Sequence, residues 1–316
     1  MEYFMDIRTY GPGDEALAIG LWNECLPMDQ IGRESFYNRV IYDANFDPGN
    51  YLLAFEGKSP AGFLYCTRRV APDEISGLEP GRAWIVAMGV SPAHRRRGAG
   101  RLLVSAAEES LSQAGASQID IGAYPTNYFC PGVDKAAYGC GINFLEALGY
   151  EARGECCSMD IGLHNYTYPD KYRARKKGLE AQGYAIKPYG AEDAIPLFSF
   201  MKECFPHWLP NVRACALSGK GEERMIIAKD GNGGVAGFVM RAMDGTDERF
   251  GPFGVKPGLQ GLGLGSLLFH EMMADMNRRR IFYTYFLWTG GRNLDIYASW
   301  GMKIYRTYCL MGKTLA

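Results

Sequence analysis

A run of arginines and two glycines precede an apolar helical pattern at residues 92–103, which read PAHRRRGAGRLL. A helix that begins at a glycine-rich loop presents unpaired backbone N–H groups, and its dipole favours anions there. Gly98 and Gly100 allow the backbone to approach a ligand closely, since they carry no side chain. The arginines can add charge-assisted hydrogen bonds. We therefore expect a phosphate-binding loop at this place.

Other interpretations of the arginine run fit less well. Short Lys/Arg-rich runs are also typical of nucleic-acid or localisation patches. The formal net charge of the chain is −1, so no global basic field favours nucleic acid or an anionic membrane. The nucleotide motif GxxxxGK[ST] is absent, and Leu103 stands where GxGxxG would need its third glycine. The loop thus matches neither a triphosphate-binding nor a dinucleotide-binding motif.

The chain contains a tandem repeat. Residues 7–27 align without a gap on residues 186–206, and the stretch 89–103 recurs at 254–268. The second copy of the loop keeps both glycines and has Gln260 in place of the first arginine. The spacing between matched segments shows that the first copy has additional residues both before and after its glycine loop. Both copies therefore predict the same loop at the same place in a repeated unit.

Each copy predicts the same order of elements. An extended start and a helix are followed by a hairpin, a third strand, the glycine loop with its helix, a further strand, a helix and a last strand. This order indicates an α/β chain with mixed sheets (α+β) and two domains. We expect an N-terminal unit at 1–162, a linker helix at 163–183 and a C-terminal unit at 184–316.

At these residues the chain resembles the GNAT superfamily of acyl-CoA-dependent N-acetyltransferases. The loop motif of that family, Q/R-x-x-G-x-G/A, is satisfied in both copies. The stretch AYPTN at 123–127 resembles the family's VNPDN, and the closing stretches FLEALGY and YASWGM resemble its YEKLGF. The resemblance implies two tandem GNAT-like units, each a splayed mixed β-sheet flanked by helices.

The resemblance also implies acetyl-CoA as a co-substrate, with its pyrophosphate on the loop amides and its pantetheine along the preceding strand. In the first copy the implied binding residues are Met88, Gly89, Val90, Arg95, Arg96, Arg97, Gly98, Ala99, Gly100, Arg101 and Asn127. In the second copy they are Phe253, Gly254, Val255, Gln260, Gly261, Leu262, Gly263, Leu264, Gly265 and Ser266. We expect both loops to bind acyl-CoA.

The implied reaction is direct attack of a primary amine on the thioester, which requires a base, a donor for the oxyanion and an acid for the thiolate. In the family the acid is commonly a Tyr four residues before the closing glycine. The second copy has Tyr297 there, whereas the first has Leu145, which cannot donate a proton. We therefore expect turnover in the C-terminal unit, with Tyr297 as catalytic acid. The open alternatives are that Tyr297 is a core aromatic, and that Tyr128 or Tyr138 supplies the acid in the first copy.

The general base is not assigned by the sequence. Asp247 and Glu248 are candidates, although turn charges of this kind are more typical of solvated positions, and Asn293 is left unassigned. The function could also be that of a non-catalytic acyl-CoA sensor or of a tandem aminoacyl transferase of wall synthesis. The acceptor is expected to be an amine of a small molecule or a peptide, and the oligomeric state stays open.

The cysteines and histidines indicate the redox state and the metal content to expect. The nine cysteines form no CxxC motif, and the four histidines form no HExxH motif, so we expect reduced thiols, a cytoplasmic location and no metal. No uninterrupted apolar run approaches the length of a membrane span, and the N-terminus has no apolar signal region. We therefore expect neither a membrane nor a nucleic acid as a partner.

Overall fold

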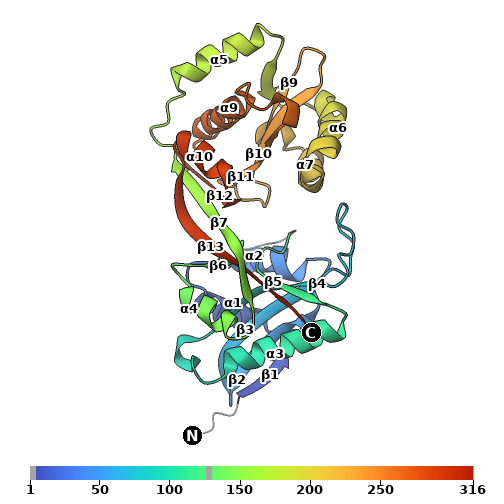
Figure 1. Ribbon diagram of the computed structural model, residues 1–316, viewed down its shortest axis with the longest axis vertical. Coiled ribbons are helices and arrows are strands. Elements are labelled where there is room, and N and C mark those ends of the chain that lie inside the picture. Colours follow the sequence, from blue (N-terminus) through green and yellow to red (C-terminus); the bar gives the residue numbers. More distant parts are fainter. Residues whose placement is uncertain (1–4, 126–129, 316) are drawn as a thin grey trace. The chain divides into compact units, whose positions relative to one another are not determined.

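The computed structural model describes residues 5–125 and 130–315 (Figure 1). The chain divides into two compact units. Unit 1 comprises the residues up to Cys157 together with those from Arg306 on, and unit 2 comprises Ser158–Tyr305. This division differs from the ranges 1–162 and 184–316 expected from the sequence, because the last strand of the chain belongs to unit 1.

Two long strands belong to both units. β7 (Glu151–Gly162) begins in unit 1 and ends in unit 2, and β13 (Lys303–Thr314) begins in unit 2 and ends in unit 1. In unit 1, β13 pairs antiparallel with β5, so that Met311 lies opposite Ile121. The C-terminal strand of the sequence therefore completes the sheet of the N-terminal half.

The sheet of unit 1 has the order β1-β2-β3-β4-β5-β13-β7, and the strand order continues from β7 to β12 (Tyr283–Thr289), which belongs to unit 2. Neighbouring pairs from β1 to β4 are antiparallel, whereas β4 and β5 are parallel. The short β6 pairs with β13. The strands are β1 (Met5–Thr9), β2 (Tyr51–Glu56), β3 (Ser59–Arg68), β4 (Arg82–Val90), β5 (Gln118–Ile121) and β6 (Val133–Asp134).

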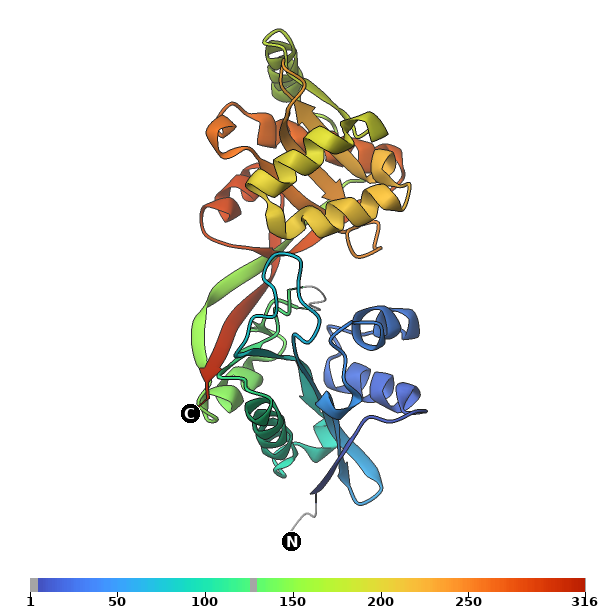
Figure 2. The same cartoon turned by 90° about the vertical axis from the view of Figure 1, so that its right-hand side faces the viewer.

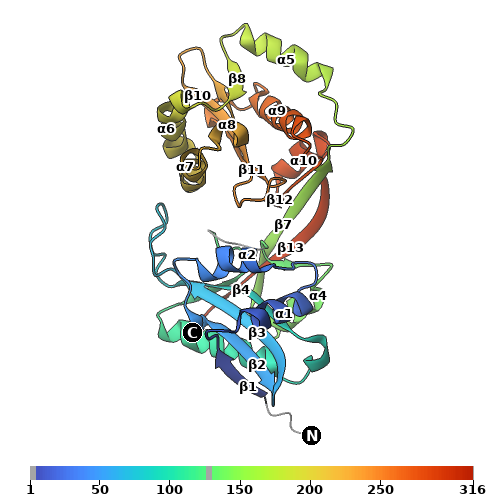
Figure 3. The same cartoon turned by 180° about the vertical axis from the view of Figure 1, so that it is seen from behind.

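Helices cover both faces of this sheet (Figures 1 and 3). Successive side chains of β3 alternate between two buried clusters, because a strand points its side chains to opposite faces. Phe63 lies in the cluster that includes α1, and Leu64 in the cluster that includes α3. The helices are α1 (Glu15–Cys25), α2 (Arg33–Phe36), α3 (Ala99–Gln113) and α4 (Gly139–Glu146). The mixed sheet flanked by helices confirms the expected fold class.

Unit 2 repeats this layout. Its four-stranded sheet has the order β11-β10-β9-β8, and β12 makes a parallel bridge next to β11, where Arg249 meets Tyr285. The two yellow helices α6 and α7 cover one face in Figure 2, and α9 packs on the other. The strands are β8 (Ala185–Pro188), β9 (Met225–Lys229), β10 (Val235–Arg241), β11 (Phe250–Val255) and β12 (Tyr283–Thr289). The helices are α6 (Ala194–Cys204), α7 (Leu209–Leu217), α8 (Gly221–Arg224), α9 (Leu264–Arg278) and α10 (Arg292–Ser299).

The stretch expected to be a linker helix contains α5 (Asp170–Glu180). This helix is part of unit 2, since Tyr172 and Leu179 are buried in the same cluster as the apolar face of α9. It therefore packs on the helix that follows the second glycine loop. None of the helices in the described parts of the chain combines the length and the apolar character needed to cross a membrane.

Candidate functional site

The first glycine loop connects β4 to α3 in unit 1. Gly98 is the N-cap residue of α3 and has a φ of +95°, a left-handed conformation that L side chains rarely adopt. The first backbone hydrogen bond of the helix runs from the N–H of Leu102 to the carbonyl of Gly98, at 3.0 Å. The preceding N–H groups, on Ala99, Gly100 and Arg101, therefore have no acceptor within the helix. Together with the helix dipole, they form a place that favours an anion.

The arginines around this loop have different surroundings. Arg97 forms an ion pair with Glu56 at 2.8 Å and does not line the neighbouring cavity. Arg95 donates from Nε to the carbonyl of Val90 at 3.1 Å, and its side chain also lines the cavity, as do Arg96 and Arg101. Arg96 and Arg101 are thus the better candidates for contacting a phosphate, and Arg97 mainly holds the loop against β2.

β4 and β5 separate directly in front of this loop. Their parallel pairing ends where Ile85 lies opposite Ile121, and β4 continues alone to Val90. On its other side, β4 contains a bulge at Val86, because Ile85 and Ala87 lie opposite consecutive residues of β3. Among the described residues, the edge of β4 from Val86 on has no strand neighbour on the β5 side. An extended ligand with amide groups can pair with such an edge.

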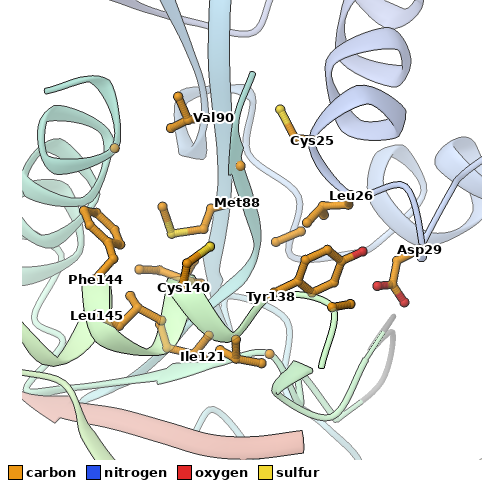
Figure 4. Close-up of a pocket in the computed structure, with 18 of the residues that line it drawn as sticks. Cys25, Leu26, Asp29, Met88, Val90, Ile121, Tyr138, Cys140, Phe144 and Leu145 are labelled. Carbon is orange, nitrogen blue, oxygen red and sulfur yellow. The ribbon is translucent and has the colours of Figure 1, made fainter. Parts of the chain in front are cut away.

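A cavity of about 580 Å³ lies between the separated strands (Figure 4). This volume is within the range of small-molecule sites, roughly 300–1,000 Å³. Its walls include Met88, Gly89 and Val90 of β4, Cys25 of α1, and Phe144 and Leu145 of α4. The cavity also reaches the glycine loop at Gly98 and Gly100. One continuous space therefore joins the start of α3 to the free edge of β4.

The polar part of the cavity contains Asp29 and Tyr138, which Figure 4 shows beside each other. The Tyr138 hydroxyl accepts a hydrogen bond from the N–H of Met28 at 3.1 Å. Burial, followed by the charge of the Asp29 carboxylate and a hydrogen bond to it, raises the pKa of Tyr138 above its ordinary value. Tyr138 is therefore protonated at neutral pH and can act as a donor.

Cys25 also lines the cavity, where α1 packs closely on β4. A Cβ atom on Gly89 would lie 2.4 Å from the Cβ of Cys25, so only glycine permits this approach. Burial raises the pKa of the Cys25 thiol to about 12. The thiol is therefore protonated at neutral pH and is not an activated nucleophile.

The fold and the loop agree with comparisons to known proteins. Residues 19–128 match the model of the Acetyltransferase (GNAT) family. This stretch of unit 1 therefore carries the sequence pattern of the GNAT family. A comparison of the sequence with curated proteins gave no significant match.

Solved GNAT structures resemble nearly the whole chain. A GCN5-related glucosamine N-acetyltransferase region of a fungal multi-domain GH3 beta-N-acetylglucosaminidase has a TM-score of 0.80 at 20% identity, over 99% of this chain and 38% of that chain. A GCN5-related N-acetyltransferase from Sphaerobacter thermophilus has a TM-score of 0.71 at 18% identity, over 98% of this chain and 95% of that one. A tandem GNAT protein from the clavulanic acid biosynthesis pathway has a TM-score of 0.66 at 15% identity, over 98% of both chains. This chain thus spans 38% of the length of the fungal protein.

The second glycine loop, in unit 2, has the same left-handed N-cap glycine as the first, but its surroundings differ. Gly263 is the N-cap of α9 with a φ of +93°, and Leu267 donates to its carbonyl at 3.2 Å. The side chain of Arg175, from α5, lies on this glycine, since a Cβ atom on Gly263 would be 2.5 Å from the Cδ of Arg175. In unit 2, therefore, the Arg175 side chain lies directly against the glycine at the helix start.

Tyr297 lies in an aromatic cluster of unit 2. Its ring centroid is 4.7 Å from that of Phe286 and 5.6 Å from that of Trp300, and the ring of Phe253 is 6.3 Å away. Burial raises the pKa of Tyr297 above its ordinary value. The repeat places Phe253 and Tyr297 at the positions of Met88 and Leu145, which line the open cavity of unit 1. The role of Tyr297 as catalytic acid stays a prediction.

The other sequence-based candidates have varied surroundings. Asn127 and Tyr128 lie outside the described residues. Asp247 forms an ion pair with Arg241 at 2.9 Å and does not line the cavity of unit 1. Sequence reasoning missed Asp29, because it lies in an irregular segment after α1 and belongs to no motif.

Among the described residues, no group of three or more His, Cys, Asp and Glu side chains is arranged to hold a metal ion.

Proposed function

We propose that unit 1 binds acetyl-CoA and transfers its acetyl group to a primary amine. The observation that carries this proposal is the continuous cavity between the start of α3 and the free edge of β4. The N–H groups at the start of α3, with Arg96 and Arg101, suit a pyrophosphate. The edge of β4 suits the amides of a pantetheine chain. These features support binding of the pyrophosphate and the pantetheine of acyl-CoA.

Acetyl-CoA, when bound, supplies a thioester whose carbonyl carbon an amine can attack. The C–N bond forms, the C–S bond breaks, the amine loses a proton and the thiolate gains one. We propose that Asp29 receives the proton of the amine and that Tyr138 donates one to the sulfur. The hydrogen bond between Tyr138 and Asp29 then returns the proton to Tyr138. A thiol with a pKa near ~8.5 departs readily as a thiolate, so it needs only modest help from an acid.

Unit 1 is preferred over unit 2 as the place of turnover for a steric reason. Met88 and Leu145 leave space in unit 1, whereas Phe253 and Tyr297 pack against each other in unit 2. Arg175 also covers Gly263. We therefore propose one acyl-CoA per chain, in place of the two suggested by the repeated motif.

A second candidate function is a non-catalytic acyl-CoA sensor. Leu145 favours it, because the position that commonly carries the acid in this family has no proton to donate in unit 1. Both functions include binding of acyl-CoA, but only the transferase acetylates an acceptor. A search for an acceptor amine therefore distinguishes them. We propose an amino sugar as the first acceptor to test, because the fungal structural neighbour is described as a glucosamine N-acetyltransferase region.

The test has two steps. Calorimetry with acetyl-CoA should give saturable binding with a stoichiometry of one, accompanied by thermal stabilisation. An amine screen that begins with glucosamine should then give a product heavier by one acetyl group in mass spectrometry. No binding at millimolar acetyl-CoA would refute the proposal, and binding without turnover across the screen would favour the sensor.

A further inference from the structure

Arg306, near the start of β13, connects two segments that border the cavity of unit 1. Its Nη1 and Nη2 atoms donate to the two carboxylate oxygens of Asp29, at 2.6 and 2.8 Å. Its Nε atom donates to the carboxylate of Asp134. The side chains of Arg306, Asp29 and Asp134 are only 12%, 11% and 4% exposed, so solvent screens these contacts little. One guanidinium thus holds two carboxylates that are far apart in the sequence.

Asp134 in turn fixes the turn that leads to Tyr138. Its carboxylate accepts hydrogen bonds from the N–H groups of Ala136 and Ala137, at 2.8 and 2.9 Å. Its carbonyl accepts the N–H of Tyr138 at 2.9 Å. The position of the Tyr138 ring therefore depends on Asp134, and the position of Asp134 depends on Arg306.

Asp29 is fixed in a similar way from the other side. Its carbonyl accepts a hydrogen bond from Nε1 of Trp22, at 2.8 Å, and Arg306 orients its carboxylate by a bidentate contact. Of the three side chains in this ion-pair cluster, Asp29 lines the cavity, whereas Arg306 and Asp134 lie behind it.

We infer that Arg306 is a positioning residue of the unit 1 site. It holds Asp29 and Tyr138 in the orientation that the reaction with the amine requires, and it does not contribute to the binding of acyl-CoA. The inference rests on the proposed function and deepens it. Arg306 contacts the polar wall of the cavity, whereas the glycine loop and the free edge of β4 are formed by other segments. The active site of the N-terminal half of the sequence therefore needs a residue from the last strand of the chain.

The experiment compares Arg306→Met and Arg306→Lys with the wild-type chain, using acetyl-CoA and the amine found in the screen. We expect Arg306→Met to lower kcat/KM for the amine by about 100-fold, since a misplacement of about 1 Å can have that effect. The Kd for acetyl-CoA should change by less than about threefold. Arg306→Lys keeps the charge but not the bidentate geometry, so it should recover part of the activity. Equal losses of acetyl-CoA affinity and of amine turnover would overturn the inference.

A matched control lies on the same strand. Lys313 of β13 forms an ion pair with Glu108 of α3, at 2.8 Å, and neither residue lines the cavity. Lys313→Met should lower the melting temperature and leave kcat/KM for the amine unchanged. If it lowers kcat/KM as much as Arg306→Met does, then Arg306 only anchors the strand and the inference is wrong.

Hydrogen exchange gives a readout that does not depend on activity. Arg306→Met should speed exchange at the amides of Ala136, Ala137 and Tyr138, with no change at the start of α3. Unchanged exchange at these amides would refute the positioning role, even if the chain bound acetyl-CoA. Faster exchange in a chain that bound no acetyl-CoA would instead support the positioning role and refute the proposed function.

Discussion

Gly98→Ala and Gly263→Ala form a matched pair that tests which glycine loop binds acyl-CoA. Both glycines are N-cap residues with nearly equal φ values, +95° and +93°. An L residue in a left-handed conformation costs about 1–2 kcal/mol, so both variants should lose roughly that much stability. For units of this size we expect the melting temperature to fall by about 2–8 °C. Strain alone therefore does not distinguish the two variants.

Ligand binding should distinguish them. A methyl group at Gly98 meets no protein atom within 4 Å, so it would point into the space proposed for the pyrophosphate. Displacing the phosphate from one charge-assisted hydrogen bond costs about 1.5–3 kcal/mol, which corresponds to a roughly 10- to 150-fold weaker Kd. Gly263→Ala should leave the Kd unchanged, because Arg175 already covers that loop.

Calorimetry with acetyl-CoA, together with thermal unfolding of both variants, measures both quantities. The reasoning would be refuted if Gly263→Ala weakened binding as much as Gly98→Ala, or if the wild-type chain bound two acetyl-CoA molecules. Either result would show that the glycine loop of unit 2 is a working site in spite of its cover.

Three further predictions concern catalysis, packing and pH. Tyr138→Phe should lower kcat by about 100-fold or more, the usual contribution of general acid catalysis, while Tyr297→Phe should leave kcat nearly unchanged; the opposite result would place turnover in unit 2. Gly89→Ala should destabilise unit 1 by about 1–3 kcal/mol in thermal unfolding, because its Cβ would lie 2.4 Å from α1, whereas Gly20→Ala, with open space around it, should not destabilise. Burial would raise the pKa of Asp193, but hydrogen bonds from Lys187 and Lys229 outweigh burial and hold the pKa at about 2. The unfolded carboxyl has a pKa near ~3.9, so the stability that this group contributes should be lost as the pH falls from about 4 to 2. Asp193→Asn should remove this part of the pH dependence of the melting temperature, and an unchanged pH profile would count against it.

Much of the binding loop could be predicted from the sequence because its determinants are local. The left-handed Gly98, the helix that starts at Ala99 and the preceding strand all lie within a few residues, and short-range sterics fix their conformation. The repeat added the same prediction for Gly263, which the structure places at the start of α9 in the same conformation.

Whether a loop borders an open cavity could not be predicted in this way. The cover of Gly263 comes from Arg175, and the filling of the space beside it comes from rings on β11, β12 and α10. Each of these contacts joins segments that are separated in the chain. A sequence motif determines the backbone conformation of its own residues. It does not determine whether other segments fill the space beside the loop.

The sequence by itself thus determined the tandem layout, the family resemblance and both glycine loops, since each is written in a continuous stretch of residues. Only the tertiary structure decided that β13 completes unit 1 and that Arg306 reaches Asp29, 277 residues earlier in the chain. The physical reason is that strand pairing depends on which edge is free when the sheet forms. No spacing within the sequence marks that edge, because β13 carries the same local pattern whichever unit it joins.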